Sequence, residues 1–385
     1  MQRTALSAEA LGRALAVRDL TDPIQGAHAL QLVVAAAVEA LGGAWACDVA
    51  VERGSPIVPV EDNYDRLRYP PGGAARDARY TRYVSATHLL RTQTSAMVPP
   101  FLARLAPALP RDLLLACPGI VYRRDAIDRL HAAEPHQLDL WRVRAAPALG
   151  ARDLDEMIRL VAAAAVPGAE IRTVPAAHPY TLAGRQVDAR EGGAWVEIGE
   201  CGLAHPAVLA DAGLPDGWTG LAMGLGLDRI VMLRKGLPDI RLLRSTDPRI
   251  AAQMADLAPW RPVSRHPPVR RDLSVAVAED ADAEVLGDRV REALGARAAD
   301  VEAVESLSET PREALPEAAR RRLGILPGQK NVLLRVVLRA LGRTLTADEA
   351  NRLRDDVYAA VHEGTAHEWA SLDYARASGL APRSG

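Results

Sequence analysis

One short segment of the sequence combines closely spaced glycines with an arginine. Residues 223–230 read MGLGLDRI, so that Gly224 and Gly226 precede Arg229. Glycines let a strand approach a planar ligand closely, and an arginine on a following helix can stack on that ligand or contact phosphates. A glycine pair alone is more typical of a tight turn, so this segment indicates ligand binding only together with a second feature.

A second segment supplies that feature, because it places cations and carboxylates on two facing strands. Arg123 and Asp125 are two residues apart and therefore share one face of a strand. Gln137 and Asp139 share one face of the returning strand, and the connecting loop carries His131. Such a hairpin can present cations to a triphosphate and carboxylates to an ammonium group or a metal ion, as ATP-dependent carboxyl activation requires. The alternative for both aspartates is a solvated strand face.

Periodicity and breaker residues predict the elements that must hold these side chains. We expect helices over residues 27–41, ended by Gly42 and Gly43, over 95–108 and over 151–166. We expect strands over residues 45–51, 113–124, 137–144 and 194–199, and a strand that continues as a helix over 219–233. Strands and helices without a βαβ rhythm predict an α+β fold with an antiparallel core.

The length of 385 residues suits more than one domain. Residues 258–268 contain four prolines and predict a linker between a catalytic domain (1–257) and a smaller module (269–363), followed by a tail (364–385). In the smaller module we expect strands over 271–277 and 332–338 and helices over 283–294 and 346–362.

The composition excludes several classes of protein. Apolar residues make up 49% and charged residues 25%, which is typical of a globular enzyme, and no apolar run approaches the 18 residues of a membrane span. The N-terminus lacks the order of a signal peptide, so we expect a cytoplasmic protein. Cys47, Cys117 and Cys201 are too far apart to predict a disulfide framework or a zinc site.

Several segments together resemble the class II aminoacyl-tRNA synthetases, specifically the phenylalanyl-tRNA synthetase alpha chain and the single-chain organellar form. GLAMGLGLDRIVMLRKGLPDIRLLRSTD is similar to the third motif of the family, and YRRD...H...HQLD is similar to the second. LLRTQTS (89–95), DNYD (62–65) and WVEIGECGLAHP (195–206) are similar to further catalytic segments, and SRHPPVRRDLSVAV and LGRTLTADEANRLRDDV resemble the anticodon-binding domain. The resemblance implies a class II antiparallel sheet flanked by helices and a C-terminal ferredoxin-like α/β sandwich.

The resemblance also implies roles for the matched residues, with Arg123, Asp125 and Arg229 as the catalytic set. The implied ATP contacts are Arg123 on the α-phosphate, Asp125 where the family usually has Glu, His131 at the outer phosphates, Gly226, and Arg229 stacked on adenine. The implied amino-acid contacts are Gln93, Ser95, Gln137, Asp139, His178, Tyr180 and Gly224, and Glu197 is the implied magnesium ligand.

The departures from the family are equally informative. Where the phenylalanine enzymes hold the substrate ring with F-P-F-T-E-P-S, this chain has His178-Pro-Tyr180-T-L-A-G, which adds a polar tip to each ring. Gln93 stands where His is usual and Val98 where Gln is usual. Pro135 replaces the phenylalanine that stacks on adenine, so His136 is the candidate to supply that stacking.

The resemblance implies an ATP- and Mg²⁺-dependent ligase that forms an acyl-adenylate of an amino acid. Three functions remain open: transfer to tRNA, transfer to a carrier or small molecule, and an inactive paralogue that acts as a binding module. Residues 264–364 carry 16 Lys and Arg against 18 Asp and Glu, a net charge of −2, so we expect weak tRNA binding through Arg320–Arg322 and Arg265, Arg270 and Arg271. The helix over 27–41 lies where class II enzymes often dimerise, and core packing explains it equally well.

Overall fold

The computed structural model describes residues 5–123, 128–263 and 266–367, which form two compact units. The first unit holds the described residues of Met1–Arg123, Glu134–Leu243 and Ala251–Trp260. The second holds those of Arg124–Ala133, Arg244–Ile250 and Arg261–Gly385. Within the described ranges, no helix has the length and apolarity needed to span a bilayer.

The first unit is built on a seven-stranded sheet. Only the pairing of the first two strands is parallel, and every other neighbouring pair is antiparallel. In spatial order the strands are β1 (Asp48–Val51), β4 (Asp112–Ile120), β5 (His136–Arg144), β9 (Thr219–Gly226), β8 (Ala194–Ala204), β7 (Thr181–Glu191) and β6 (Ile171–Pro175). The predicted antiparallel sheet flanked by helices is thus confirmed.

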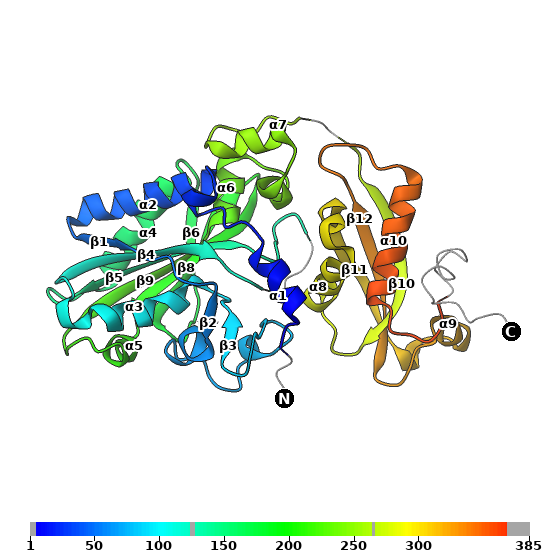
Figure 1. Ribbon diagram of the computed structural model, residues 1–385, viewed down its shortest axis with the longest axis horizontal. Coiled ribbons are helices and arrows are strands. Elements are labelled where there is room, and N and C mark those ends of the chain that lie inside the picture. Colours follow the sequence, from blue (N-terminus) through cyan, green and yellow to red (C-terminus); the bar gives the residue numbers. More distant parts are fainter. Residues whose placement is uncertain (1–4, 124–127, 264–265, 368–385) are drawn as a thin grey trace. The chain divides into compact units, whose positions relative to one another are not determined.

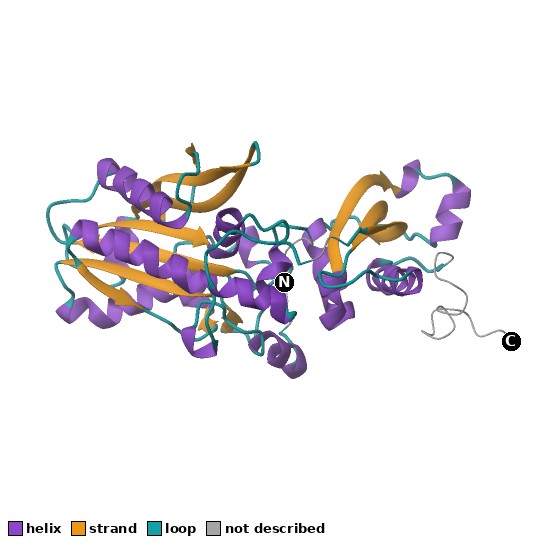
Figure 2. Cartoon of the chain, turned by 90° about the horizontal axis from the view of Figure 1, so that it is seen from above, coloured by secondary structure: helices purple, strands orange, loops and turns teal. Residues whose placement is uncertain are grey.

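Helices cover both faces of this sheet (Figures 1 and 2). The back face is covered by α2 (Ala29–Trp45), α4 (Ala151–Ala165) and α6 (Leu227–Lys235). The front face is covered by the 3₁₀ helix η4 (Thr94–Met97), α3 (Val98–Leu105) and α5 (Pro206–Asp211). Phe101, Trp141 and Val208 are buried in the core between the front face and its helices. The first unit also contains α1 (Ala8–Leu15) and a hairpin of β2 (Ile57–Pro59) and β3 (His88–Leu90). All but the last residue of the short helix α7 (Pro248–Ala251) belong to the second unit.

The helix predicted over residues 27–41 continues through the two glycines that we expected to end it. His28 caps α2, since its Nδ1 accepts a hydrogen bond from the backbone N–H of Leu30. The helix ends only at Ala46, which adopts a left-handed conformation with φ of 47°. A Cβ on Gly42 would lie 3.0 Å from a methyl group of Val49, so close packing of β1 on the helix explains the glycine.

The second unit is a three-stranded antiparallel sheet with helices. Its strands are β10 (Val269–Ala278), β12 (Gln329–Leu338) and β11 (Val301–Pro311), in that spatial order. Its helices are α8 (Ala283–Leu294), α9 (Glu317–Leu323) and α10 (Ala347–Val361), of which α8 and α10 share one apolar core with the sheet. A ferredoxin-like sandwich requires a fourth strand, which is not among the described residues, so that part of the fold remains a prediction.

Candidate active site on the front face

Alternate residues of β5 point to opposite faces of the sheet, and this alternation divides the HQLD segment. Gln137 and Asp139 lie on the front face, where both contact η4. His136 lies on the back face, where it contacts Asp228 in the first turn of α6. The segment therefore brings two of its polar residues to the site and places a third in the interior.

Glycines form an open floor beside these side chains. Across the sheet, Asp139 pairs with Gly224, and Gln137 pairs with Gly226. A Cβ on Gly224 would lie 3.7 Å from the Asp139 carboxylate, and one on Gly226 would lie 3.9 Å from its nearest neighbour, the carbonyl oxygen of Ile198. A methyl group would thus fit at either position, and the predicted contact of a flat ligand with these glycines remains a prediction.

Asp139 organises the part of the site that we assign to the amino-acid head group. Its Oδ1 accepts hydrogen bonds from Ser95 Oγ at 2.8 Å and Trp141 Nε1 at 3.3 Å, and its Oδ2 accepts one from Thr94 Oγ1 at 2.9 Å. Burial raises the pKa of this carboxyl, while the hydrogen bonds favour its charged form. Asp139 is only 2% exposed, so it positions Ser95 and Thr94.

Gln93 is also buried, and both ends of its amide are occupied within the protein. Its Oε1 accepts a hydrogen bond from the Tyr69 hydroxyl at 2.9 Å, and its Nε2 donates to the carbonyl oxygen of Asn63 at 2.9 Å. These contacts argue against the direct substrate contact expected for Gln93. They indicate that it fixes the ring of Tyr69.

Two arginines act on one carboxylate near the glycine floor. Arg229 lies with its Nη1 3.4 Å from the carbonyl oxygen of Glu197 and 3.7 Å from the Glu197 carboxylate. Arg123 is exposed and donates from Nε to the carbonyl oxygen of Thr92 at 3.0 Å. Burial raises the pKa of Glu197, and the charges of Arg229 and Arg123 oppose that rise. The predicted residues Arg123, Arg229 and Glu197 therefore share one electrostatic environment.

Glu197 could hold a magnesium ion only at a site with few protein ligands. Within residues 5–123, 128–263 and 266–367, no group of three or more His, Cys, Asp or Glu side chains is arranged to hold a metal. Magnesium sites often use one or two carboxylates together with substrate phosphates, so a partly exposed carboxylate beside Arg229 is compatible with a metal that arrives with ATP.

Two of the expected nucleotide contacts are not placed at this site. Asp125 lies outside the described residues. His131 belongs to the second unit, where its Nδ1 lies 2.7 Å from the carboxylate of Asp128. Their contacts with ATP remain predictions.

The structure argues against the predicted stacking of His136 on adenine. The His136 side chain is fully buried, and its Nε2 accepts a hydrogen bond from the backbone N–H of Leu20 at 3.1 Å. Nδ1 lies 3.0 Å from Asp228 Oδ1, and the backbone N–H of His136 donates to Asp228 Oδ2 at 2.6 Å. Because both ring nitrogens are occupied and neither ring face reaches solvent, His136 is a structural residue.

The residues expected to contact the substrate ring cluster together. The Tyr180 ring stacks on Trp141 with centroids 6.0 Å apart and lies 5.8 Å from His178 and 6.2 Å from Tyr69. His178 Nε2 lies 2.6 Å from a carboxylate oxygen of Glu200. This hydrogen bond raises the pKa of His178, with burial opposing the rise. The altered wall is therefore planar and carries an ion pair.

Glu200 is the site residue that sequence reasoning missed. Simple alternation from Glu197 would place Glu200 on the other face of β8. The pairing of β7 with β8 shifts between Val187 and Asp188, which leaves Ile198 as an extra residue in β8, and this bulge turns Glu200 to the face of Glu197. The glycine after Ile198 was a signal for a bulge, because glycines inside strands often mark one.

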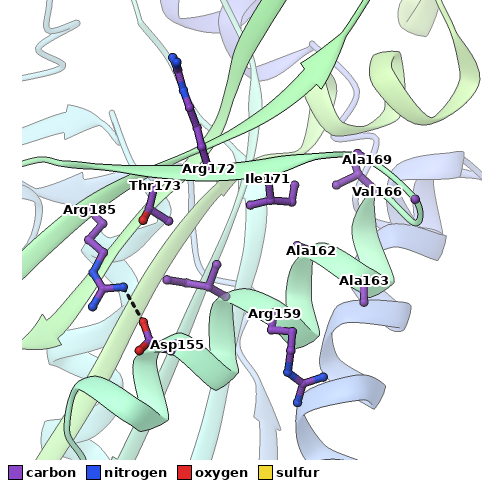
Figure 3. A pocket seen from close by; sticks show the side chains of 12 residues that line it. Asp155, Arg159, Ala162, Ala163, Val166, Ala169, Ile171, Arg172, Thr173 and Arg185 are labelled. Carbon is purple, nitrogen blue, oxygen red and sulfur yellow. Dashed lines mark hydrogen bonds and ion pairs between the residues drawn. The ribbon is translucent and has the colours of Figure 1, made fainter.

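A separate cavity of about 470 Å³ lies between α4 and β6, at the far edge of the sheet (Figure 3). Ile158 and Ile171 contribute to its apolar lining, and an ion pair of 2.5 Å joins Arg185 and Asp155 at one end. None of the predicted site residues lines it. This cavity is therefore separate from the predicted site.

Comparison with known proteins identifies the family to which the residues of this site belong. The family model described as tRNA synthetases class II core domain (F) matches residues 45–254, more than half of the chain. The phenylalanine–tRNA ligase alpha subunit of Prochlorococcus marinus (strain NATL2A) is 34% identical over 192 residues, which cover 50% of this chain and 56% of that protein. The alpha subunit of Heliobacterium modesticaldum (strain ATCC 51547 / Ice1) is 32% identical over 245 residues, which cover 60% of this chain and 70% of that protein.

The chain thus spans little more than half the length of the Prochlorococcus relatives that it matches. The matched segment contains all seven strands of the large sheet and the helix α6, and therefore every strand that forms the site. The resemblance predicted from the motifs is confirmed: this chain belongs to the family of tRNA synthetases with the class II core domain (F), and is similar to phenylalanine–tRNA ligase alpha subunits.

Proposed function

We propose that this chain is an ATP-dependent ligase that activates the carboxyl group of an amino acid as an acyl-adenylate and transfers the acyl group to tRNA. The carrying observation is that Arg229 lies 3.7 Å from the Glu197 carboxylate beside the glycine floor. The names of the relatives support tRNA as the acceptor and an amino acid related to phenylalanine as the substrate. We assign this chemistry to residues 1–257 and an anticodon-binding type of role to residues 269–363.

In the proposed reaction, a carboxylate oxygen of the amino acid attacks the α-phosphorus of ATP. The bond from that phosphorus to the oxygen bridging to the β-phosphate breaks, and pyrophosphate leaves. The guanidinium groups of Arg123 and Arg229 offset the negative charge that develops on the phosphate oxygens. Mg²⁺, held by Glu197 and the phosphates, would neutralise further charge on the leaving pyrophosphate.

The front-face network prepares the amino acid for this attack. Asp139 holds Ser95 and Thr94, and the backbone N–H of Thr94 donates to Gln137 Oε1 at 3.2 Å. Ser95 and Gln137 thereby have fixed orientations before the ligand arrives. Such preorganisation lowers the entropic cost of orienting the carboxylate towards the α-phosphorus.

An ATP–pyrophosphate exchange screen over all amino acids and related acids tests the adenylation. We expect exchange with at least one acid and none without an added acid. Absence of exchange with every acid would contradict the proposed activation and favour an inactive paralogue. Retention of Arg123, and of Arg229 at 3.7 Å from the Glu197 carboxylate, argues against that alternative, because a binding module has no need for this arrangement.

Transfer to a carrier or a small molecule is the second candidate, favoured by the charge of the second unit. Residues 264–364 have a net charge of −2, whereas a domain that grips RNA usually has a basic face. Arg320–Arg322 lie in the last turn of α9, Arg270 and Arg271 lie on β10, and Arg265 lies outside the described residues. We expect weak tRNA binding that is lost near physiological salt.

Filter binding with total tRNA at 20 to 200 mM salt (about the range over which phosphate contacts weaken) distinguishes the acceptors. Tight, salt-tolerant binding would contradict the expected weak binding and support an ordinary tRNA synthetase. No binding even at low salt would favour the non-tRNA acceptor.

A further inference from the structure

The side-chain end of the amino-acid subsite contains a charged pair. The Nε2 of His178 lies 2.6 Å from a carboxylate oxygen of Glu200, and the two side chains are 16% and 37% exposed. Within the pair, His178 occupies one acceptor position of a carboxylate that has about four. Glu200 is therefore able to accept a further hydrogen bond from a ligand.

The pair adjoins a wall of planar rings. Tyr180 lies between His178, at 5.8 Å, and Trp141, at 6.0 Å, and Tyr69 lies at 6.2 Å. Burial, with a smaller contribution from the charge of Asp139, raises the pKa of Tyr180 well above its ordinary value, so its phenol stays neutral. An aromatic wall favours a flat side chain over a branched or flexible one, because stacked rings gain contact area at little entropic cost.

The sheet register sets the separation between this pair and the head-group residues. Asp139 pairs with Gly224 in β9, and Gly224 pairs with Glu200 in β8, so all three lie in one row on the front face. Two strand spacings separate Asp139 from Glu200, or about 10 Å between backbones. Gly224, between them in the row, contributes no side chain. That span suits an amino acid whose head group lies near Ser95 and Gln137 and whose ring ends near Glu200.

We propose that the His178–Glu200 pair determines specificity and selects an amino acid with a planar side chain that ends in an O–H or N–H donor. This inference rests on the proposed adenylation and specifies its substrate class. Phenylalanine would cover the Glu200 carboxylate with a C–H edge and remove water from it without supplying a donor. The pair already satisfies part of its own hydrogen bonding, so we expect a discrimination of about 10- to 100-fold, the range for one unmade hydrogen bond to a charged group.

Matched amino acids test the inference by ATP–pyrophosphate exchange. Tyrosine and 4-methylphenylalanine have nearly the same shape and differ in the donor, and 4-aminophenylalanine supplies a second donor. We expect kcat/KM to be about 10- to 100-fold higher for tyrosine, and likewise for 4-aminophenylalanine, than for 4-methylphenylalanine. Equal kcat/KM for tyrosine, 4-methylphenylalanine and phenylalanine would overturn the inference while leaving the adenylation intact.

Two variants link the preference to the pair. H178F/E200A removes both polar groups at once, so it leaves no charge unpaired, and we expect it to abolish the preference for donors. Glu200→Gln keeps the size of the side chain but removes its charge, so the preference should fall severalfold in a variant with unchanged folding. Glu39→Ala, at an exposed position of α2, is the matched control and should leave the preference unchanged. An undiminished preference in both site variants would overturn the role of the pair.

A failure of adenylation itself is distinguishable from a failure of this inference. If no acid supports exchange, binding of the same amino acids is measured through their effect on thermal unfolding. A larger stabilisation by tyrosine than by 4-methylphenylalanine, lost in H178F/E200A, would still support the specificity role. Equal shifts would overturn it.

Discussion

Consecutive polar residues of two motifs serve different purposes on the two faces of the seven-stranded sheet. On the back face, His136 and Asp228 are buried and bond to each other. Their immediate neighbours remain partly exposed: Gln137 lies on the front face, and Arg229 reaches Glu197 from the first turn of α6. In each of the two motifs, one residue is buried and supports the fold, and the next residue faces the candidate site. A match to a motif therefore assigns a function only after the face of each residue is known.

Asp228→Ala, on the back face, should cause a larger loss of stability than substitution of a partly exposed front-face carboxylate such as Glu197. The carboxylate of Asp228 is 3% exposed and accepts from both the backbone and the ring of His136. Removing it leaves buried donors without their partner, so the free energy of unfolding should fall by about 3 to 5 kcal/mol. Urea denaturation followed by tryptophan fluorescence measures this.

The front face supplies the contrast to that variant. Glu197→Gln changes a carboxylate whose side chain is 42% exposed, so the free energy of unfolding should change by less than about 0.5 kcal/mol. Equal destabilisation by Asp228→Ala and Glu197→Gln would contradict the division of roles between the two faces.

Arg123→Ala and Arg229→Ala should have the largest effect on activity and little effect on stability. Each guanidinium is proposed to stabilise charge on the reacting phosphate, so each loss should cost about 2 to 4 kcal/mol of transition-state stabilisation. That corresponds to about a 30- to 1,000-fold lower rate of ATP–pyrophosphate exchange. Arg159→Ala, which removes an exposed arginine of α4 at the separate cavity, is the control. Exchange that survives both site substitutions would show that the active-site assignment is wrong.

The sequence predicted the local parts of this division well. Residues 151–166 and 283–294 were expected to be helical and correspond to α4 and α8, whose patterns are set by neighbours in the chain. The facing strands β4 and β5 and the strand-to-helix transition at Gly226 were also expected. However, β4 ends at Ile120, so the expectation that Arg123 lies on this strand was wrong. Local periodicity was sufficient because each element buries one clear apolar stripe.

The missed features depend on contacts between distant residues. The burial of His136 requires Asp228, 92 positions away in the chain. The orientation of Glu200 depends on a bulge that only the pairing with β7 reveals. The continuation of α2 through Gly42 depends on the approach of β1, which overrides the weak helical preference of glycine. In each case tertiary packing decided what local preference left open.

His28 should make the back face sensitive to acid. Its Nδ1 accepts from the N–H of Leu30, and its Nε2 bonds to the carbonyl oxygen of Leu243, so the ring must be neutral. Burial lowers its pKa from 6.5 to about 4, and the hydrogen bond to the carbonyl oxygen of Leu243 opposes that fall. A lowered folded-state pKa means that the stabilisation is complete above pH 6.5 and is lost as the pH falls towards 4.

The shift of His28 corresponds to about 3 kcal/mol between pH 7 and pH 4. His28→Asn keeps an acceptor for the cap of α2 and does not titrate. We therefore expect the difference in unfolding free energy between wild type and His28→Asn to shrink by that amount over this range, as measured by urea denaturation at several pH values. A constant difference would exclude a buried neutral histidine.

Gly226→Ala should give the smallest effect and the finest test of the front face. Gly226 has a φ of −86°, which alanine adopts without strain, and its Cβ would lie 3.9 Å from the nearest atom. The protein should therefore tolerate the methyl group, whereas a ligand lying on the glycine floor would meet it at a cost of about 1 to 3 kcal/mol. We expect a higher KM for ATP with an unchanged free energy of unfolding.

Gly43→Ala is the matched control, because that glycine is exposed within α2 and has no atom within 4 Å of its added methyl group. It should raise stability by up to about 1 kcal/mol through helix propensity alone and leave KM unchanged. Equal KM values in the two alanine variants would mean that the nucleotide does not lie on the glycine floor.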